Sequence, residues 1–291
     1  MKEPAKGRQP GRDSDPEAES PQSRHHQREE AEVEDRIAIS AHVVYKAILA
    51  EGESELKRPT SALAFSGFAA GLSMGFSFLA VGLLQASLPE RAWAPLVAKL
   101  GYPMGFLVVI LGRQQLFTEN TLTAVLPLLK DKTWATFVNV VRLWLTVLLA
   151  NWLGTIAFAW VVAQPWAVAN DARAALHHIS LEAIQPGFLA TMVKGIFAGW
   201  LIALLVWLLP FAETGRVAVI ILMTYIIALG SFTHVVAGSV DAFYLVALGE
   251  RNWGEYLGDF MWPTLLGNIL GGVSLVSVLN HAQVTAGSSS P

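Results

Sequence analysis

Several long stretches of this sequence are apolar and uncharged, and they limit the fold more than any other feature. Residues 60–88, 143–170 and 217–240 contain no Asp, Glu, Lys or Arg. An α-helix needs about 20 apolar residues to cross the hydrocarbon core of a bilayer. Charged residues make up only 15% of the 291 residues, whereas soluble domains average about 25%. The sequence therefore predicts an all-α integral membrane protein.

The apolar stretches predict six transmembrane helices. The expected spans cover about 60–88, 100–129, 134–163, 187–209, 217–248 and 262–279. Polar residues interrupt the second span after Gly112 and the fifth span from Gly230. Breaks at corresponding positions of two three-helix halves are typical of inverted repeats, with the transport path at the repeat interface. We therefore expect two inverted three-helix repeats with broken second and fifth helices.

The rest of the chain divides by composition. Residues 1–34 are charged and rich in Pro, Ser and Gln, which predicts a disordered N-terminal tail. Residues 35–58 predict an amphipathic helix, which either lies on the membrane surface or packs on the body of the protein. The channel domain then covers residues 59–282, and residues 283–291 form a second disordered tail.

Basic residues predict the orientation in the membrane. The tail, Lys57, Arg58, Lys130 and Lys132 would lie on one side of the membrane. Loops rich in Lys and Arg stay in the cytoplasm, so we expect both termini to be cytoplasmic. The tail has no apolar core of a signal peptide.

Small residues recur every four positions in three of the spans. They are Gly67, Gly71 and Gly75 in the first span, Gly195 and Gly199 in the fourth, and Gly267 and Gly271 in the sixth. Such spacing allows two helix backbones to approach closely, either within one chain or at a subunit contact.

The two breaks contain the main candidates for chemistry. Thr118 and Asn120 lie in the first break, where the second half-helix would point its partly positive N-terminus inward. His234 lies in the second break. An ionisable residue inside a membrane segment is costly and is a candidate functional group; the alternative is a neutral His bonded to a carbonyl. Lys194 and Asp241 are further intramembrane charges.

Arg142 is another charge in the apolar region, near the predicted cytoplasmic start of the third span. There it can extend to the membrane surface, which favours a structural role.

Other functions lack their sequence patterns. There is no P-loop, no GxSxG and no His/Glu/Asp metal cluster, so we expect no enzyme activity, no cofactor and no metal. The chain has no cysteine, which excludes disulfides and thiolate ligands. A net charge of −3 gives no basis for nucleic-acid binding.

Residues 60–282 resemble the formate/nitrite transporter family. The pieces that carry the resemblance are LFTENTLT after Gly105, RLWLTVLLANWLG at 142–154, GIFAGWLIALLVW at 195–207, SFTHVVA at 231–237 and GNILGG at 267–272. Their order and spacing make the resemblance specific. The long charged N-terminal extension is similar to that of a less characterised inner-membrane branch of the family.

The resemblance implies an aquaporin-like protomer in a homopentamer, with one pore per protomer and small weak-acid monoanions as substrates. It implies that Thr118 faces His234 across the pore and that Asn268 supports the histidine. Tyr102, Phe106 and Ile227 would form apolar constrictions on either side. It also implies a bacterial inner-membrane location.

Three positions depart from the family pattern. Formate channels often have Glu before the central histidine, where this chain has Thr233. The Asn usual in the fourth-span motif is Gly199, and the basic residue of the vestibule has no clear match, so Arg173 or Lys194 would replace it.

The leading hypothesis is a channel or proton-coupled carrier in which His234 hands the anion a proton. An aquaporin-like pore for neutral solutes and a membrane scaffold without transport are the alternatives.

Overall fold

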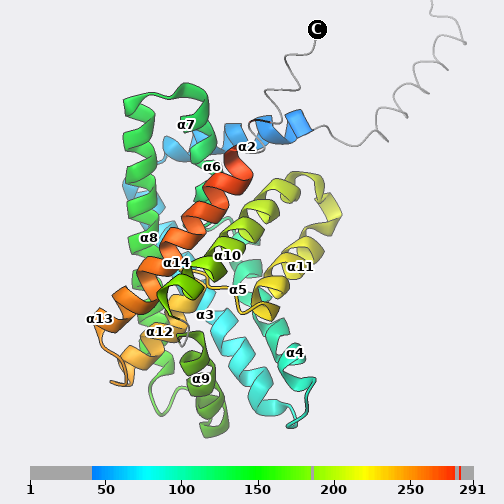
Figure 1. Ribbon diagram of the computed structural model, residues 1–291, viewed down its shortest axis with the longest axis vertical. Helices are drawn as coiled ribbons and strands as arrows, with labels where there is room; N and C mark the ends of the chain where they lie inside the picture. Colours follow the sequence, from blue (N-terminus) through cyan, green and yellow to red (C-terminus); the bar gives the residue numbers. More distant parts are fainter. Residues whose placement is uncertain (1–40, 185–186, 279–281, 283–291) are drawn as a thin grey trace, which may run out of the picture. The chain divides into compact units, whose positions relative to one another are not determined.

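The computed structural model describes residues 41–184, 187–278 and 282, and within this part all regular structure is helical (Figure 1). The predicted tails, residues 1–34 and 283–291, lie outside the described residues, as do residues 35–40 of the predicted amphipathic helix.

Four helical stretches are long and apolar enough to cross a membrane. They are Thr60–Ser87, Ala94–Leu111, Trp134–Val162 and Phe188–Phe211, with 28, 18, 29 and 24 residues. Two shorter apolar helices, Arg216–Leu229 and Ala237–Ala247, follow.

The elements of the first half are α2 (Ala41–Leu56), α3 (Thr60–Ser87), α4 (Ala94–Ala98), η1 (Lys99–Gly101), α5 (Pro103–Leu111), α6 (Asn120–Thr123), α7 (Val125–Asp131) and α8 (Trp134–Val162). Those of the second half are α9 (Asn170–Ala183), α10 (Phe188–Leu208), η2 (Leu209–Phe211), η3 (Glu213–Gly215), α11 (Arg216–Leu229), α12 (Ala237–Ala247), α13 (Trp253–Glu255), η4 (Tyr256–Met261), α14 (Trp262–Ile269) and η5 (Leu270–Val278).

The glycine repeats lie at helix contacts within the chain. Gly71 of α3 lies against the carbonyl oxygen of Asn151 on α8, and Gly199 of α10 lies against that of Asn268 on α14. A Cβ at either glycine would collide with backbone that cannot move aside. The small residues therefore bring α3 onto α8 and α10 onto α14.

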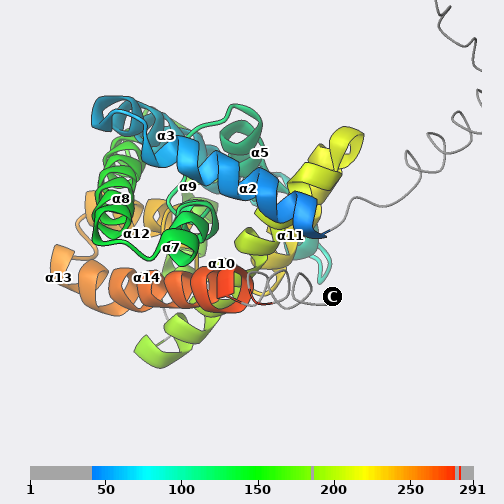
Figure 2. The ribbon, with the colours of Figure 1, turned by 90° about the horizontal axis from the view of Figure 1, so that it is seen from above.

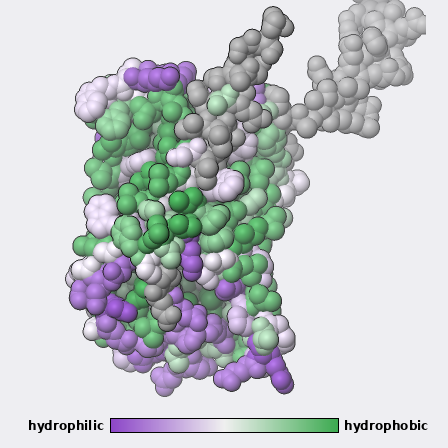
Figure 3. All heavy atoms as spheres, viewed as in Figure 1, coloured by the Kyte–Doolittle hydropathy of each residue, from purple (hydrophilic) through white to green (hydrophobic). Residues whose placement is uncertain are grey.

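Apolar side chains cover the middle of the molecule. On the face shown in Figure 3, hydrophilic residues gather at the two ends and hydrophobic residues lie between them. Large apolar side chains remain exposed there, among them Phe65, Leu153 and Trp160. A surface of this kind suits the hydrocarbon of a bilayer as solvent.

Helix α2 packs on the body of the protein. It lies across one end of the long helices, over α6 and α7 (Figure 2). Val44 and Ile48 are buried against a cluster that includes Leu122, Leu126 and Ala203.

Arg142 of α8 ties the end of α2 to the start of α3. Its guanidinium donates to the carbonyl oxygens of Leu56 at 2.7 Å and Arg58 at 3.1 Å, and to the Thr60 hydroxyl at 3.0 Å. A cation that satisfies the last carbonyls of a helix stabilises that end. Arg142 is therefore structural, as predicted.

Three predicted boundaries need correction. The helix before the first break begins at Ala94 rather than near Leu100, because Pro95 starts α4 and the chain stays helical through Lys99. The residues between the third and fourth predicted spans contain a helix, α9, whose buried Leu176 packs in the core. The last span is preceded directly by α13 and η4, so the continuous helical stretch begins at Trp253 rather than Trp262.

Candidate functional site

The two helix breaks begin with the same backbone turn. α5 ends at Gly112 and is followed by Arg113 with φ 50°, while α11 ends at Gly230 and is followed by Ser231 with φ 46°. In both, the left-handed residue donates to the carbonyl three positions back, and the next residue donates to the carbonyl five back. These are the paired bonds of a Schellman motif, which turns the chain out of the helix.

Each break is then held by one buried asparagine. Asn151 of α8 accepts from Phe117 N at 3.0 Å and donates to Gln115 O at 2.8 Å. Asn268 of α14 accepts from Val235 N at 2.8 Å and donates to Thr233 O at 2.9 Å.

The remaining amide hydrogen of each asparagine binds a glycine carbonyl. Asn151 donates to Gly67 O on α3 at 2.8 Å, and Asn268 donates to Gly195 O on α10 at 2.9 Å. Non-helical backbone at membrane depth needs such internal partners. The resemblance implied that Asn268 supports the histidine, whereas its bonds go to the backbone of Thr233 and Val235 on either side of His234 and to Gly195. The role of Asn151 was not predicted, although the sequence signal was the asparagine in the apolar segment LLANWLG.

Thr118 and His234 meet at the centre of the molecule. Thr118 Oγ1 lies 2.7 Å from His234 Nε2, although the residues are 116 positions apart. The two residues are 0% and 1% exposed. The two breaks thus place these two candidate residues in direct contact.

The hydrogen bonds of His234 indicate which ring nitrogen carries the proton. Nδ1 accepts from the backbone N–H groups of Val236 at 3.3 Å and Ala237 at 3.1 Å. A ring nitrogen that accepts carries no proton, so the neutral ring holds its proton on Nε2. His234 therefore donates Nε2–H to the Thr118 hydroxyl.

Aromatic and aliphatic side chains enclose this pair. The Phe106 ring meets the His234 ring edge to face, with centroids 5.2 Å apart at 82°. Tyr102, one turn earlier, lies 5.3 Å from Phe106, and Ile227 is fully buried in the same core. The predicted constriction residues thus belong to one apolar core around the polar centre.

Two residues predicted to line the path, Thr233 and Lys194, make no hydrogen bond to the Thr118–His234 pair among the described residues. Thr233 turns its hydroxyl to Thr191 O on α10 at 2.8 Å, which fixes the break to that helix. Lys194 is half-buried on α10, and in the part of the chain that the structure describes no hydrogen bond joins it to Thr118 or His234.

A polar cavity of about 440 Å³ opens between α2 and the first break. Charged residues of both signs line it, namely Glu51, Glu55, Arg58, Arg113, Glu119 and Arg216. Glu55 forms an ion pair with Arg58 at 3.0 Å and accepts a hydrogen bond from Gln115 Nε2 at 2.9 Å. Gln115 Oε1 in turn accepts from Asn120 Nδ2 at 3.2 Å. Arg173 and Lys194, the two candidates for the basic residue of a vestibule, are not among the residues that line it.

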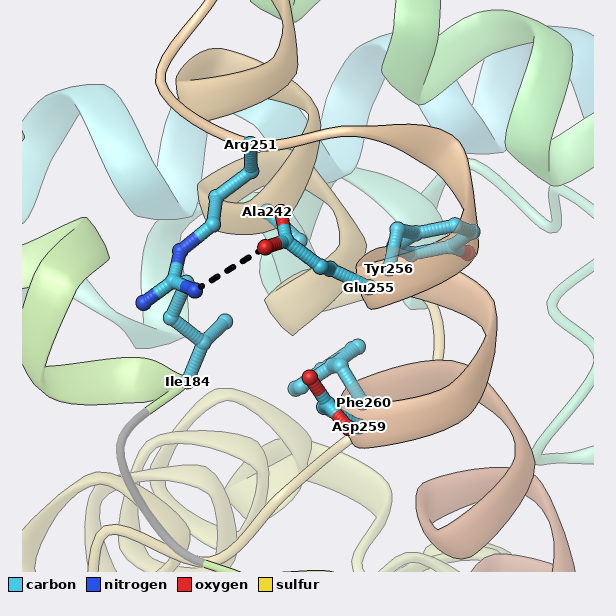
Figure 4. A pocket seen from close by; sticks show the side chains of 7 residues that line it. All are labelled: Ile184, Ala242, Arg251, Glu255, Tyr256, Asp259 and Phe260. Carbon is cyan, nitrogen blue, oxygen red and sulfur yellow. Dashed lines mark ion pairs between the residues drawn. The ribbon is translucent and has the colours of Figure 1, made fainter.

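The hollow drawn in Figure 4 is a poor candidate site. It lies between α9, α12 and η4, where Arg251 and Glu255 form an ion pair at 3.6 Å. Its volume is about 20 Å³, which is room for one water molecule. Among the described residues, no group of three or more His, Asp or Glu side chains could hold a metal ion.

Sequence comparison agrees with this architecture. A family model described as formate/nitrite transporter matches residues 42–282, which includes α2 and every element after it. The chain belongs to the formate/nitrite transporter family. The family resemblance inferred from the sequence pieces is thereby confirmed.

Individual relatives support the assignment. The inner membrane protein YfdC of Escherichia coli is 43% identical over 251 residues, which cover 86% of this chain and 81% of that protein. The formate channel BtFdhC of Bacillus thuringiensis is 25% identical over 79% of this chain and 89% of that protein.

A solved structure described as a pentameric formate channel with formate bound matches 78% of this chain and 98% of its own, at 19% identity and a TM-score of 0.65. This likeness shows the fold. The relatives are transporters and channels, so the prediction that the chain is not an enzyme is confirmed.

Proposed function

We propose that this protein conducts small monovalent anions of weak acids, such as formate or nitrite, across a bacterial inner membrane. The observation that carries the proposal is the buried contact between Thr118 Oγ1 and His234 Nε2 at the meeting point of the two breaks. A hydroxyl and an N–H group inside an otherwise apolar core offer an anion polar partners at the one place where hydration is lost.

The proposed architecture is six spans in two inverted three-helix repeats. The matched Schellman turns, the matched asparagines and the matched glycine contacts support it. Residues 67, 113 and 151 correspond in these contacts to residues 195, 231 and 268. Matching turns and contacts in the two halves are expected when the halves share one fold in opposite orientation.

The apolar residues around the pair would select against a charged, hydrated ion. Tyr102, Phe106 and Ile227 surround the centre, so a bare anion would be desolvated there at high cost. A weak acid avoids much of that cost by passing as the neutral molecule. The apolar surroundings therefore favour anions that can be protonated to a neutral acid near physiological pH.

Proton coupling through His234 has a geometric condition. Because Nδ1 already accepts two backbone N–H groups, a proton can bind there only if those groups turn away. Transfer by His234 would therefore be accompanied by movement of the second break. In the arrangement seen, Nε2–H acts as a hydrogen-bond donor to the passing species.

The homopentamer and the cytoplasmic termini are part of the proposal. The pentameric formate channel shares the fold, and exposed apolar side chains on the long helices give a surface that lipid or a second copy could cover. Helix α2 and the α7–α8 turn, which carries Lys130 and Lys132, lie at one end of the molecule (Figure 1). The positive-inside rule assigns that end to the cytoplasm.

The test is anion flux into proteoliposomes. We expect the wild-type protein to pass formate, nitrite or hydrosulfide, and His234→Ala to reduce the rate at least about tenfold. His178→Ala is the matched control, because this histidine is exposed on α9. Undiminished flux in His234→Ala would contradict the role of the histidine. Osmotic swelling with water or small polyols, without anion flux, would indicate a neutral-solute pore.

A further inference from the structure

Glu119 is the one vestibule carboxyl that the proposed path does not explain. It follows Thr118 directly in the chain and lines the cavity beside α2. An acidic side chain at this place repels an entering anion when it is ionised. A carboxyl group beside an anion path therefore needs an explanation.

The carboxyl group of Glu119 is poorly satisfied. Its Oε1 atom is out of contact with solvent and has no hydrogen-bond partner. An unpaired, dehydrated carboxylate oxygen is costly. Two changes remove the cost: a proton on the carboxyl group, or a partner brought by the permeating species.

The neighbouring charges do not supply that partner. On α2, Glu55 is bound by Arg58, and Glu51 is exposed and negative. Arg113 of the first break and Arg216 of α11 line the same cavity and are exposed. The arginines can draw an anion into the vestibule, while Glu119 is the lining residue that follows Thr118 directly in the chain.

We propose that Glu119 is the proton donor that converts the entering anion into its neutral acid at the vestibule side of the Thr118–His234 pair. The O–H bond of the Glu119 carboxyl breaks as an O–H bond forms on the anion. The products are the neutral acid and the Glu119 carboxylate, which regains a proton from water in the vestibule. One proton thus crosses with each anion, and His234 keeps its ring protonation unchanged.

Only the first break has a carboxyl group at this position. Ala237 occupies the position in the second break that matches Glu119, since residues 113 and 231 correspond. The nearest carboxyl there is Asp241, half-buried one turn further along α12. The inference rests on the proposed function, because it requires that a weak-acid anion uses this path.

The experiment measures anion flux and internal pH together in proteoliposomes loaded with a pH-sensitive dye, with formate as the probe. The wild-type protein should carry formate with a proton, faster at lower pH. Glu119→Gln keeps the shape but cannot transfer a proton, and should lose at least about tenfold in rate together with the pH dependence. Glu182→Gln, at an exposed site on α9 outside the vestibule, is the control and should remain near the wild-type rate.

Three results would overturn the assignment. They are unchanged proton-coupled flux in Glu119→Gln, an equal loss in Glu182→Gln, and wild-type formate flux without proton movement. Absence of any small-anion flux in the wild-type protein would instead remove the proposed function, and this inference with it. Gel filtration of each variant in detergent checks that it is folded.

Discussion

At the scale of single residues, two asparagines stabilise the candidate path. Asn151 and Asn268 are 0% exposed, and each satisfies one backbone N–H group and two carbonyl groups. No water is available at this depth to replace those bonds. The Thr118–His234 contact depends on them, because they fix the two segments that carry the pair.

Replacing Asn268 with Ala should destabilise the protein by about 3 kcal/mol, since each buried backbone group left unpaired costs about 1–3 kcal/mol. Asn151→Ala should cost a similar amount, because its bonds are equivalent. Thermal unfolding in detergent measures the effect. Asn139→Ala, at an exposed site on the same helix as Asn151, is the control. Equal melting temperatures for all three variants would contradict the role of the asparagines.

Thr118 tests the contact itself. Thr118→Val keeps the shape but removes the hydroxyl that accepts from His234 Nε2, so anion flux should fall at least about tenfold. Thr118→Ser keeps the hydroxyl and should retain most of the flux. Both variants can be measured in the proteoliposome assay. A valine variant as fast as the serine variant would show that the path does not use this contact.

At the scale of elements, close helix pairs set the positions of the breaks. α3 with α8 and α10 with α14 approach at Gly71 and Gly199, and this places Asn151 and Asn268 against the breaks. Helix α2 adds a cover at one end, held by Arg142 and by the buried cluster around Ile48.

Gly199→Ala should destabilise the protein by about 1–3 kcal/mol, because the added methyl group meets the backbone of Asn268. Gly258→Ala is the control: a Cβ there meets nothing within 4 Å, and the residue is exposed in η4. Thermal unfolding compares the two. The prediction fails if Gly199→Ala melts at the temperature of the control.

Helix α2 is also attached by an ion pair whose pH dependence has a definite sign. Lys130 Nζ lies 2.7 Å from Glu53 Oε1 and holds the pKa of that carboxyl below its ordinary value. A lowered carboxyl pKa gives stability that is present above the unfolded value, about 4.3, and is lost as pH falls through the folded value.

Glu53→Gln should therefore weaken the protection of α2 from protease slightly at pH 7, and less at pH 3. The effect is small because the pair is solvent-exposed. Limited proteolysis at both pH values tests it, with Glu51→Gln on the same helix as control. A larger effect of Glu53→Gln at pH 3 than at pH 7 would contradict the sign.

At the scale of the whole molecule, the fold places two polar ends on either side of an apolar belt. The chain has no cysteine, so single-cysteine variants can report which end faces the cytoplasm. Thr133→Cys at the α7–α8 turn should be labelled by an impermeant maleimide only after the membrane is opened. Asp171→Cys at the start of α9 should be labelled in intact spheroplasts. The reverse pattern would invert the proposed orientation.

The sequence by itself determined much of this protein. Hydropathy is a local property, so the uncharged stretches indicated the long helices, and the polar residues after Gly112 and Gly230 indicated where helices end. Helix α9 was not predicted, because a short amphipathic helix lacks the long apolar stretch that indicates a membrane span.

Only the tertiary structure decided what meets at the breaks. Thr118 and His234 are 116 positions apart, and their contact depends on how α3, α8, α10 and α14 pack. Local sequence carries no information on the partner of a buried hydroxyl or of a carboxyl such as Glu119. Long-range packing supplies it, so the apolar spans fixed the scaffold and the fold assembled the site.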